Sequence, residues 1–293
     1  MKLLITGASG LYGSKLAKIA STKGFEVYSG YNKDPPTFGI PVQFDVSAKE
    51  QVEKTFKKVK PEIVVHAATL TDVDRCETDK QLAWKINVEG TRHMVEETRK
   101  MEAFLIYIST DYVFNGNKGL YVENSRPDPI NYYGFTKLKA EEYVKAMVDK
   151  YCIARTSVIF GSVPATGKVN FALWLLNKLK RNEKINIITD QWNSPTLNTN
   201  LAEMTIEIVE RQLNGVFHLS GATRISRYDF AMLLSKIFAF ETNLIHPIKA
   251  EDLTMIAKRP KDSSLNISKA KNLLKNQPIP IHSALKKLKK ELI

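Results

Sequence analysis

The stretch Thr6-Gly7-Ala8-Ser9-Gly10-Leu11-Tyr12-Gly13 joins an apolar run at residues 2–6 to an amphipathic stretch at residues 11–23. In such a turn the first glycine makes a tight bend, the second lets backbone N–H groups approach a pyrophosphate, and the third allows a helix to pack closely on a strand. The amino end of the helix then faces the negative charge. A glycine triplet also fits a plain strand-to-helix turn, but its place between a strand and a helix favours a dinucleotide site.

The first half of the chain alternates short β-branched runs with amphipathic stretches, which is typical of a parallel sheet wrapped by helices. We therefore expect an α/β protein with a Rossmann-type doubly wound parallel sheet. The expected strands lie near residues 2–6, 26–31, 41–44, 62–66, 103–109 and 151–156, and the expected helices near 11–23, 49–59, 79–100 and 131–150.

After residue 155 the alternation becomes less regular. Gly- and Pro-containing loops at 161–169 and 190–198 indicate where the chain leaves the first sheet to build a smaller C-terminal lobe. We expect residues 1–160 to form an NAD(P)-binding domain and residues 161–293 to form mainly a substrate-binding lobe, with roughly 185–220 returning to the main sheet. A cleft between two lobes is the expected ligand site. The expected elements of this half are helices at 170–181, 201–213 and 226–240 and strands at 184–189 and 216–219.

Composition excludes several classes of protein. The 293 residues are 43% hydrophobic and 25% charged, as in an ordinary globular protein. The longest apolar runs end within a few residues, far short of the roughly 20 that span a bilayer. The two cysteines and five histidines have no metal-ligand spacing, so we expect no metal site. The first residues lead directly into a strand without a cleavable apolar segment, so the expected location is the cytoplasm.

The formal net charge of +12 raises the question of a nucleic-acid partner. Residues 249–293 hold eleven Lys and Arg against four Asp and Glu, and Leu285, Leu288 and Leu292 there have helical spacing. This pattern predicts an amphipathic terminal helix with a solvated basic face. No recognised nucleic-acid-binding module accompanies the charge, so we expect no nucleic-acid partner. A moderate positive field also suits an anionic small molecule such as a nucleotide sugar.

Residues after the second and third strands bear on the choice of cofactor. An NAD-specific site places an acid at the end of the second strand, and Ser29 to Lys33 contains none. Lys33 is suited to a 2′-phosphate, which favours NADPH and leaves NADH open, although the side chain also fits a solvated turn. Asp45-Val46 closes the third strand, where Asp45 fits either an acceptor for the adenine amino group or a cap of the next helix.

The strand predicted at 103–109 leads to Thr110, at the sheet edge where open α/β folds bind ligands. Further along the chain, Tyr133 and Lys137 are four residues apart, about 40° around a helix, whereas Tyr132 is about 140° from the lysine. Tyr133 therefore shares the face of Lys137. A cationic ammonium there is expected to favour the phenolate and to bring Tyr133 toward the range of a general acid.

These features occur in an order that resembles the extended short-chain dehydrogenase/reductase family and, within it, the dTDP-4-dehydrorhamnose reductases. The resemblance covers nearly the whole chain. Its most specific parts are Ser109-Thr110-Asp111-Tyr112-Val113-Phe114 and Arg259-Pro260-Lys261-Asp262-Ser263. The glycine turn and the Tyr/Lys pair are shared by the wider superfamily. The other matching stretches are residues 67–74, 76–77, 87–91, 115–116, 133–137, 155–157, 190–191, 194–196 and 215–221.

The resemblance implies reduction by NADPH of the C4 ketone of a dTDP-linked 6-deoxy sugar, which completes dTDP-L-rhamnose. It makes Thr110, Tyr133 and Lys137 the catalytic set: Tyr133 protonates the developing alkoxide, Lys137 tunes it and holds the nicotinamide ribose, and Thr110 orients the ketone. With the residues above, the cofactor set is Gly7, Ser9, Gly10, Leu11, Tyr12, Gly13, Lys33, Asp45, Val46, Ala67, Ala68, Thr69, Asn87, Tyr133 and Lys137.

For the nucleotide-sugar substrate, the resemblance implies that Val73, Asp111 and Tyr112 line the sugar pocket. We expect Asn170, Trp192 and Arg259 to be further substrate-binding residues. Many of these reductases carry a tryptophan after the Arg155-Thr156-Ser157 stretch, and this chain has Val158 there. Trp192 is a candidate for the missing aromatic wall, or it packs within the lobe. Arg259 is a candidate for the nucleotide diphosphate, with surface solvation as the alternative.

Two other functions fit the same residues. A nucleotide-sugar epimerase or dehydratase of this superfamily recycles a tightly bound NAD, against which the missing acid after the second strand counts. A non-catalytic regulatory role also fits, because the beta subunit of methionine adenosyltransferase resembles this branch in its Tyr/Lys pair and Arg-Pro block. The sequence leaves open whether the chain forms a homodimer.

Overall fold

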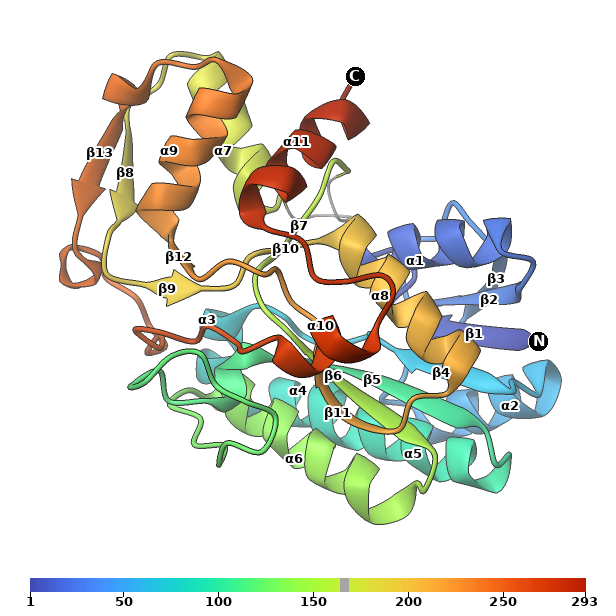
Figure 1. Cartoon of the computed structure of the whole chain (residues 1–293). Helices are drawn as coiled ribbons and strands as arrows, with labels where there is room; N and C mark the ends of the chain where they lie inside the picture. The colour runs from blue at the N-terminus through green and yellow to red at the C-terminus, as the bar shows by residue number, and fades with distance from the viewer. Residues whose placement is uncertain (164–168) are drawn as a thin grey trace.

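The computed structural model describes residues 1–163 and 169–293, so residues 164–168 of the loop expected at 161–169 lie outside the described residues. Its centre is a seven-stranded sheet in the order β11-β6-β5-β4-β1-β2-β3 (Figure 1). Every neighbouring pair in this sheet is parallel. The strands are β1 (Lys2–Thr6), β2 (Glu26–Tyr31), β3 (Ile40–Gln43), β4 (Ile63–His66), β5 (Phe104–Thr110), β6 (Tyr151–Thr156) and β11 (Gly215–His218).

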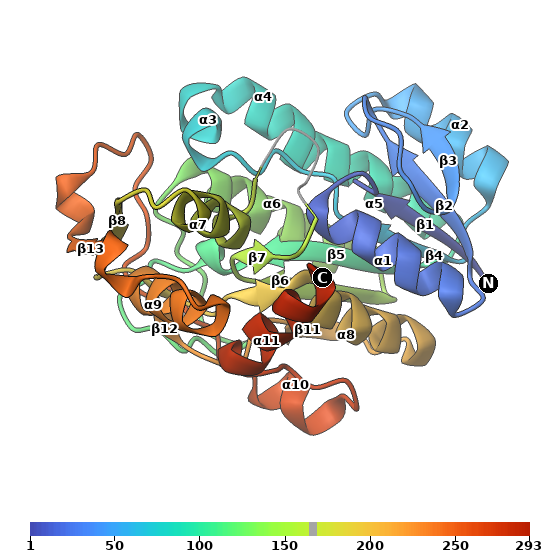
Figure 2. The same cartoon turned by 90° about the horizontal axis from the view of Figure 1, so that it is seen from above.

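Helices cover both faces of this sheet (Figure 2). One face packs on α2 (Lys49–Val59), α5 (Gly90–Lys100) and α6 (Tyr132–Met147). The other face packs on α1 (Leu11–Thr22), α8 (Asn198–Arg211) and α10 (Ser268–Leu273). Side chains alternate between the faces along a strand, so Leu3 and Ile5 of β1 enter one core and Leu4 enters the other. The predicted doubly wound parallel sheet is confirmed.

The strand order reverses between β1 and β4, because β2 and β3 follow on one side of β1 and the later strands lie on the other. At such a switch point the loops leave the carboxyl ends of the two strands in opposite directions and open a crevice. The glycine turn follows β1 and residues 67–71 follow β4. The main cleft of the protein begins at this point.

The helix expected at 79–100 is confirmed as one continuous helical stretch, formed by α4 (Lys80–Trp84), a π-helical turn at Lys85–Glu89 and α5. A separate short helix, α3 (Val73–Thr78), precedes it. The side chains of Asp72 and Asp79 accept hydrogen bonds from backbone N–H groups at the starts of α3 and α4, at 3.0 Å each. Asp79 thus starts the expected helix, and Asp72 starts a short helix that the apolar periodicity did not predict.

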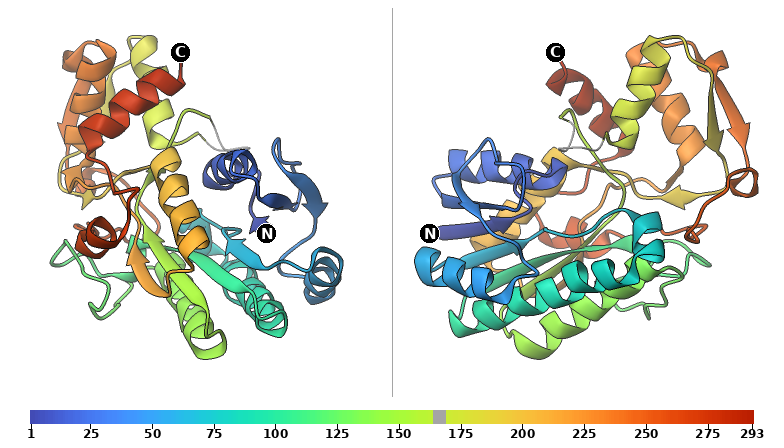
Figure 3. Two further views of the ribbon diagram at one scale, coloured as in Figure 1. Left: turned by 45° about the vertical axis from the view of Figure 1, so that its right-hand side comes forward. Right: turned by 180° about the vertical axis from the view of Figure 1, so that it is seen from behind.

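The C-terminal lobe has its own core, formed by α7 (Phe171–Lys180), α9 (Arg227–Phe238) and α11 (Ile281–Glu291) (Figure 3). Leu285 and Leu288 of α11 are buried in it, as the pattern of the terminal helix predicts, while Leu292 is 40% exposed. Three two-stranded sheets complete the lobe: β8 (Ile185–Ile188) with β13 (Ile245–Ile248), β9 (Trp192–Asn193) with β12 (Ile225–Ser226), and β7 (Ile159–Phe160) with β10 (Thr196–Leu197).

The return of the chain to the main sheet begins later than residue 185. β8 pairs with β13 inside the lobe, and only α8 and β11 rejoin the layers of the main sheet. Short 3-10 turns at Asp111–Val113, Thr242–Leu244 and Ala250–Asp252 connect the remaining segments. Among the described residues no helix is both long enough and apolar enough to span a membrane.

Candidate active site

The glycine turn leaves no room for side chains at two of its positions. Gly7 has a φ of +68°, which only glycine adopts without strain, and a Cβ on Gly13 would lie 2.2 Å from the Gly7 carbonyl oxygen. The N-cap of α1 is Gly10, which provides no side-chain acceptor for the first N–H groups of the helix. Uncapped N–H groups beside a bare backbone turn fit a pyrophosphate. The residues present therefore fit a dinucleotide.

Lys33 and Asp45, the two residues expected near the adenosine part of the cofactor, both line the cleft. Lys33 lies just beyond β2, and Asp45 lies just beyond β3. One carboxylate oxygen of Asp45 accepts a hydrogen bond from the Ser47 N–H at 2.8 Å, in the turn before α2. The helix itself has Ala48 as its N-cap, so Asp45 supports the preceding turn rather than capping the helix. Asp34, the residue after Lys33, also lines this end of the cleft and was not anticipated.

The expected catalytic residues meet at the carboxyl end of β5. Thr110 is the last residue of β5, and Tyr133 and Lys137 lie one turn apart at the start of α6. The Asn131 side chain starts α6 by accepting a hydrogen bond from the Gly134 N–H at 2.8 Å. All three line one cleft of about 830 Å³, so the structure brings together what the sequence placed 27 residues apart.

The electrostatics of this set differ from the expectation. Burial raises the pKa of Tyr133 above its ordinary value, and a hydrogen bond with Thr110 only partly opposes that effect. Burial also lowers the pKa of Lys137 to about 7, so at neutral pH much of its charge is lost. The Lys137 Nζ donates to the Ile108 carbonyl oxygen at 2.8 Å and lies 4.2 Å from the centre of the Tyr107 ring. The expected lowering of the Tyr133 pKa by Lys137 is therefore wrong for this arrangement, because burial dominates both groups.

Asp111 is 3% exposed and its carboxylate is held by hydroxyl groups from three segments. It accepts hydrogen bonds from Thr110 at 3.0 Å, Ser157 at 2.8 Å and Ser263 at 2.5 Å. Burial nevertheless raises the pKa of Asp111, and the three hydroxyl groups oppose this. Because Thr110 donates its proton to Asp111, its oxygen is directed toward other donors in the cleft.

Most of the predicted binding residues line this same cleft. Val73 and Tyr112 lie beside the catalytic set, and Asn170 lies on the lobe side as the N-cap of α7. The other predicted residues in the cleft come from the glycine turn and from the segments that follow β3 and β4. The full set found there is Gly7, Ser9, Gly10, Leu11, Tyr12, Gly13, Lys33, Asp45, Val46, Ala67, Ala68, Thr69, Val73, Thr110, Asp111, Tyr112, Tyr133, Lys137 and Asn170.

Asn87 is not among the residues that line the cleft. It lies in the π-helical turn, 1% exposed, and its carboxamide oxygen accepts hydrogen bonds at 2.7 Å from the Thr69 hydroxyl and from the Leu70 N–H. Its amide nitrogen donates to the Thr136 hydroxyl at 3.0 Å. Asn87 therefore joins the loop after β4 to the catalytic helix from behind the cleft wall.

Trp192 and Arg259 also lie away from the cleft lining. The Arg224 guanidinium lies 5.0 Å from the centre of the Trp192 ring, which packs Trp192 at the base of the lobe. Arg259 forms an ion pair of 2.9 Å with Asp74 of α3 and donates to the Ala257 carbonyl oxygen at 2.8 Å. The pair joins the C-terminal segment to the dinucleotide-binding half, so the Arg259 guanidinium already has an acidic partner.

The lobe contributes cleft residues that the sequence analysis did not single out, chiefly Phe171 and Arg227. Both are the first residues of helices, α7 and α9, and each follows a capping side chain. Nothing local in the sequence directs them toward a cleft formed by distant segments. Val158, where many similar reductases have tryptophan, also lines the cleft, with a φ of +36° that is strained for a β-branched residue.

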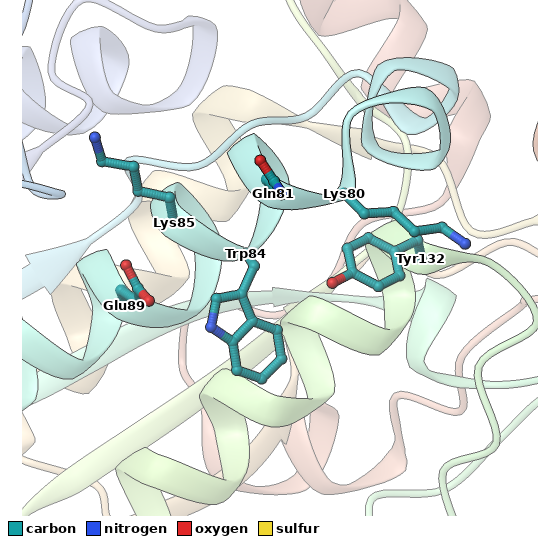
Figure 4. A pocket seen from close by; sticks show the side chains of 6 residues that line it. All are labelled: Lys80, Gln81, Trp84, Lys85, Glu89 and Tyr132. Carbon is teal, nitrogen blue, oxygen red and sulfur yellow. The ribbon is translucent and has the colours of Figure 1, made fainter.

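A second, shallower pocket of about 340 Å³ lies on the outer side of α4 and α6, outside this cleft (Figure 4). Its walls are Lys80, Gln81, Trp84, Lys85, Glu89 and Tyr132. The Trp84 indole points toward α6, where the Phe135 ring lies 6.4 Å away. The expected absence of a metal site stays a prediction. Over residues 1–163 and 169–293, no three His, Cys, Asp or Glu side chains gather in a way that could hold an ion.

Comparison with known proteins places this geometry in a family. The chain is 30% identical over 302 residues to a dTDP-4-dehydrorhamnose reductase of Aggregatibacter actinomycetemcomitans, covering 98% of each. It is 28% identical over 292 residues to methionine adenosyltransferase 2 subunit beta of Xenopus tropicalis, covering 97% of this chain and 86% of that protein. The fold matches the dTDP-4-dehydrorhamnose reductase of Bacillus anthracis, solved in complex with NADP, with a TM-score of 0.90 at 29% identity over 99% of each chain. The family model described as the RmlD substrate binding domain matches residues 1–293, and the chain belongs to that family, within the extended short-chain dehydrogenase/reductases.

Proposed function

We propose that this protein is an NADPH-dependent reductase that converts the C4 ketone of dTDP-4-dehydro-6-deoxy-L-mannose to the alcohol of dTDP-L-rhamnose. The observation that carries the proposal is the meeting of Thr110, Tyr133 and Lys137 with the glycine turn in one cleft. The similar reductases named above support the reaction and the cofactor. Lys33 beside the adenosine end supports NADPH, since a 2′-phosphate needs a cation there.

NADPH, when bound, supplies the hydride. Tyr133 supplies the proton: its raised pKa keeps the phenol protonated at neutral pH, so that it donates as the alkoxide develops. Thr110 donates its hydroxyl proton to Asp111 in this structure, and in the reaction it turns that proton to the ketone oxygen and so orients it beside the phenol. Lys137, held at the Ile108 carbonyl, lies within the same buried region and interacts with the ribose and the phenol once the cleft is filled.

The test is oxidation of NADPH and of NADH, followed at 340 nm, with enzymatically prepared dTDP-4-dehydro-6-deoxy-L-mannose. We expect consumption with formation of dTDP-L-rhamnose, and a lower KM for NADPH than for NADH. NADPH binding without consumption would reject reduction of this sugar nucleotide. It would favour another sugar or the regulatory role that resemblance to the methionine adenosyltransferase subunit leaves open, and a pull-down of that enzyme would separate the two.

Three further expectations stand as proposals. The residues before 160 hold the cofactor, and the lobe after 161 closes over the sugar nucleotide. The cytoplasm is the proposed location, because NADPH and sugar nucleotides are supplied there. For a homodimer, the partly exposed rings of Trp84, Tyr132 and Phe135 offer an apolar surface, and light scattering of the purified protein gives the assembly state directly.

A further inference from the structure

Among the described residues, the cations that line the cleft are Lys33, Lys137 and Arg227. Lys33 lies at the adenosine end, just beyond β2. Lys137 is 2% exposed and its ammonium is held at the Ile108 carbonyl oxygen. Arg227 is the one of the three that comes from the C-terminal lobe, at the start of α9. Over residues 1–163 and 169–293, the positive charge on the lobe side of the cleft is therefore that of Arg227.

Arg227 forms no ion pair with any described residue, in contrast to its neighbours. Arg224, three residues earlier, lies 2.7 Å from Asp262, and Arg259 lies 2.9 Å from Asp74. The Arg227 guanidinium instead lies 5.1 Å from the centre of the Phe171 ring, which also lines the cleft. Stacking on an aromatic ring orients a guanidinium, and one of its donors forms a hydrogen bond with the Tyr112 hydroxyl. The remaining edge donors are available for an anion.

The position of Arg227 relative to the catalytic tyrosine fits the shape of the proposed substrate. In a 4-keto sugar nucleotide, the ketone and the diphosphate are attached at opposite ends of one pyranose ring. The Tyr112 ring lies edge-on to the Tyr133 ring at 6.1 Å, and Arg227 lies close enough to the Tyr112 hydroxyl for its charge to act on the pKa of that phenol. Arg227 thus contacts Tyr112, whose ring lies next to that of Tyr133, the group that protonates C4 in the proposed reaction.

We propose that Arg227 binds the diphosphate of the sugar nucleotide while the Phe171 ring holds its guanidinium in place. This inference rests on the proposed function and adds the residue that recognises the anionic part of the substrate. The amino end of α9 adds little to the site, because Asp229 in its first turn offsets the partial positive charge there, so the guanidinium is the group that would bind the anion. Arg259, the candidate from the sequence, is engaged by Asp74 and does not line the cleft.

The experiment compares Arg227→Ala and Arg227→Lys with wild type, by calorimetric titration of dTDP and by steady-state reduction of the keto sugar nucleotide. We expect dTDP binding by Arg227→Ala to weaken about tenfold to a hundredfold, as for loss of hydrogen bonds to a charged group. The KM for the sugar nucleotide is expected to rise by a similar factor with kcat changed less than threefold. Arg227→Lys keeps the positive charge but lacks the paired N–H donors of the guanidinium. Its dTDP affinity and its KM are expected to lie between those of Arg227→Ala and wild type.

The matched control is Lys236→Ala, which removes one exposed positive charge from the same helix, away from the cleft. It is expected to bind dTDP like wild type, and all variants to keep the wild-type Kd for NADPH. Unchanged dTDP affinity in Arg227→Ala, or no dTDP binding by wild type, overturns the anion site. If wild type binds dTDP through Arg227 but reduces no keto sugar, the site stands and the proposed reaction fails.

Discussion

Tyr133 shows how one side chain carries the proposed chemistry. Its phenol lines the cleft between Thr110 and Lys137, and burial keeps it protonated. Tyr133→Phe removes the proton donor and little else, so kcat is expected to fall by about a hundredfold or more. NADPH affinity, measured by fluorescence titration, is expected to change less than threefold. Turnover within tenfold of wild type would remove Tyr133 from the mechanism.

His66 makes a separate prediction about pH. Its ring lies between the hydroxyls of Thr6 and Thr91, at 2.8 and 3.1 Å, and burial lowers its pKa to about 3. The unfolded chain, with an ordinary pKa near 6.5, binds a proton more readily, so the contribution of neutral His66 to stability is present above pH 6.5 and is lost as pH falls toward 3. At pH 5 the loss is about 2 kcal/mol from this histidine.

The check is the free energy of urea unfolding at several pH values between 4.5 and 7.5. His66→Gln is expected to show a smaller decrease toward low pH than wild type, whatever its stability at pH 7. His282→Gln, at an exposed position, is the control and is expected to keep the wild-type dependence. An unchanged dependence in His66→Gln would mean that His66 does not resist protonation in the folded state.

At the scale of single residues, the sequence predicts those site residues whose relative positions follow from the geometry of one helix. Tyr133 and Lys137 are four apart on one helix, so their common face is fixed by helix geometry. Arg227 could not be found this way, because its neighbours in the cleft are more than fifty residues distant. The electrostatic effect of Lys137 was misjudged for a similar reason: burial, which sets both pKa values, depends on the whole fold.

At the scale of elements, α6 and β6 are joined by a buried ion pair. Arg155 is 1% exposed and contacts both carboxylate oxygens of Glu141, at 2.9 and 2.7 Å, while Ser109 of β5 donates to the same carboxylate at 2.6 Å. These hydrogen bonds hold the catalytic helix against the sheet. Glu141→Leu leaves the buried guanidinium without its partner, and we expect it to lower the free energy of unfolding by about 3–5 kcal/mol.

Urea unfolding of three variants tests this ion pair. Glu142→Leu changes the next residue, which is exposed and pairs only with Lys139, and is expected to stay within about 0.5 kcal/mol of wild type. The double variant Glu141→Leu/Arg155→Met removes both charges and is expected to regain most of the loss. A double variant no more stable than Glu141→Leu would show that shape, rather than the unpaired charge, causes the effect.

Elements with strong periodicity were predicted closely, and short ones were not. The strands of the main sheet and the helices α1, α2, α6, α7 and α9 lie within three residues of the expected bounds. The two-residue strands β7, β9, β10 and β12 went unrecognised, because so few residues carry no pattern and their partners lie 32 to 37 residues away in the chain. The short helix α3 was also missed, because it has six residues and begins at a side-chain cap that apolar spacing does not reveal.

For the molecule as a whole, residues 257–265 cross from the lobe to the dinucleotide-binding half. Three contacts hold them there: the ion pair between Arg259 and Asp74, a hydrogen bond from the Ser263 hydroxyl to the Asp111 carboxylate, and a hydrogen bond of 3.0 Å from the Asp262 N–H to the Gly116 carbonyl oxygen. Because the Arg259 guanidinium is 15% exposed and bound to Asp74, we expect it to fix the lobe rather than to bind diphosphate. Arg259→Ala is expected to speed amide exchange in residues 256–263 and to leave dTDP affinity within threefold of wild type.

A double-mutant cycle separates the two roles of Arg259. Asp74→Ala alone is expected to reproduce the faster exchange, and the double variant Asp74→Ala/Arg259→Ala to add little to either single change. If Arg259→Ala weakens dTDP binding tenfold while Asp74→Ala does not, Arg259 reaches the substrate after all. The parallel sheet could be predicted from the sequence, but this crossing could not, since no local pattern relates residues 185 positions apart.

The face of the sheet that packs on α1 draws on both ends of the chain. Leu3, Ile5 and Leu16 share one core with Met204, Phe217 and Leu274. When a ribosome has made only the first 160 residues, α8, β11 and α10 are therefore missing from this layer, and at roughly 10 residues per second about 13 seconds pass before the rest follows. During that interval the apolar face around α1 is open to chaperones and to other nascent chains. A fragment that ends at residue 160 lacks these packing partners permanently, so the face of the sheet around α1 can be completed only after the C-terminal residues of the chain have been made.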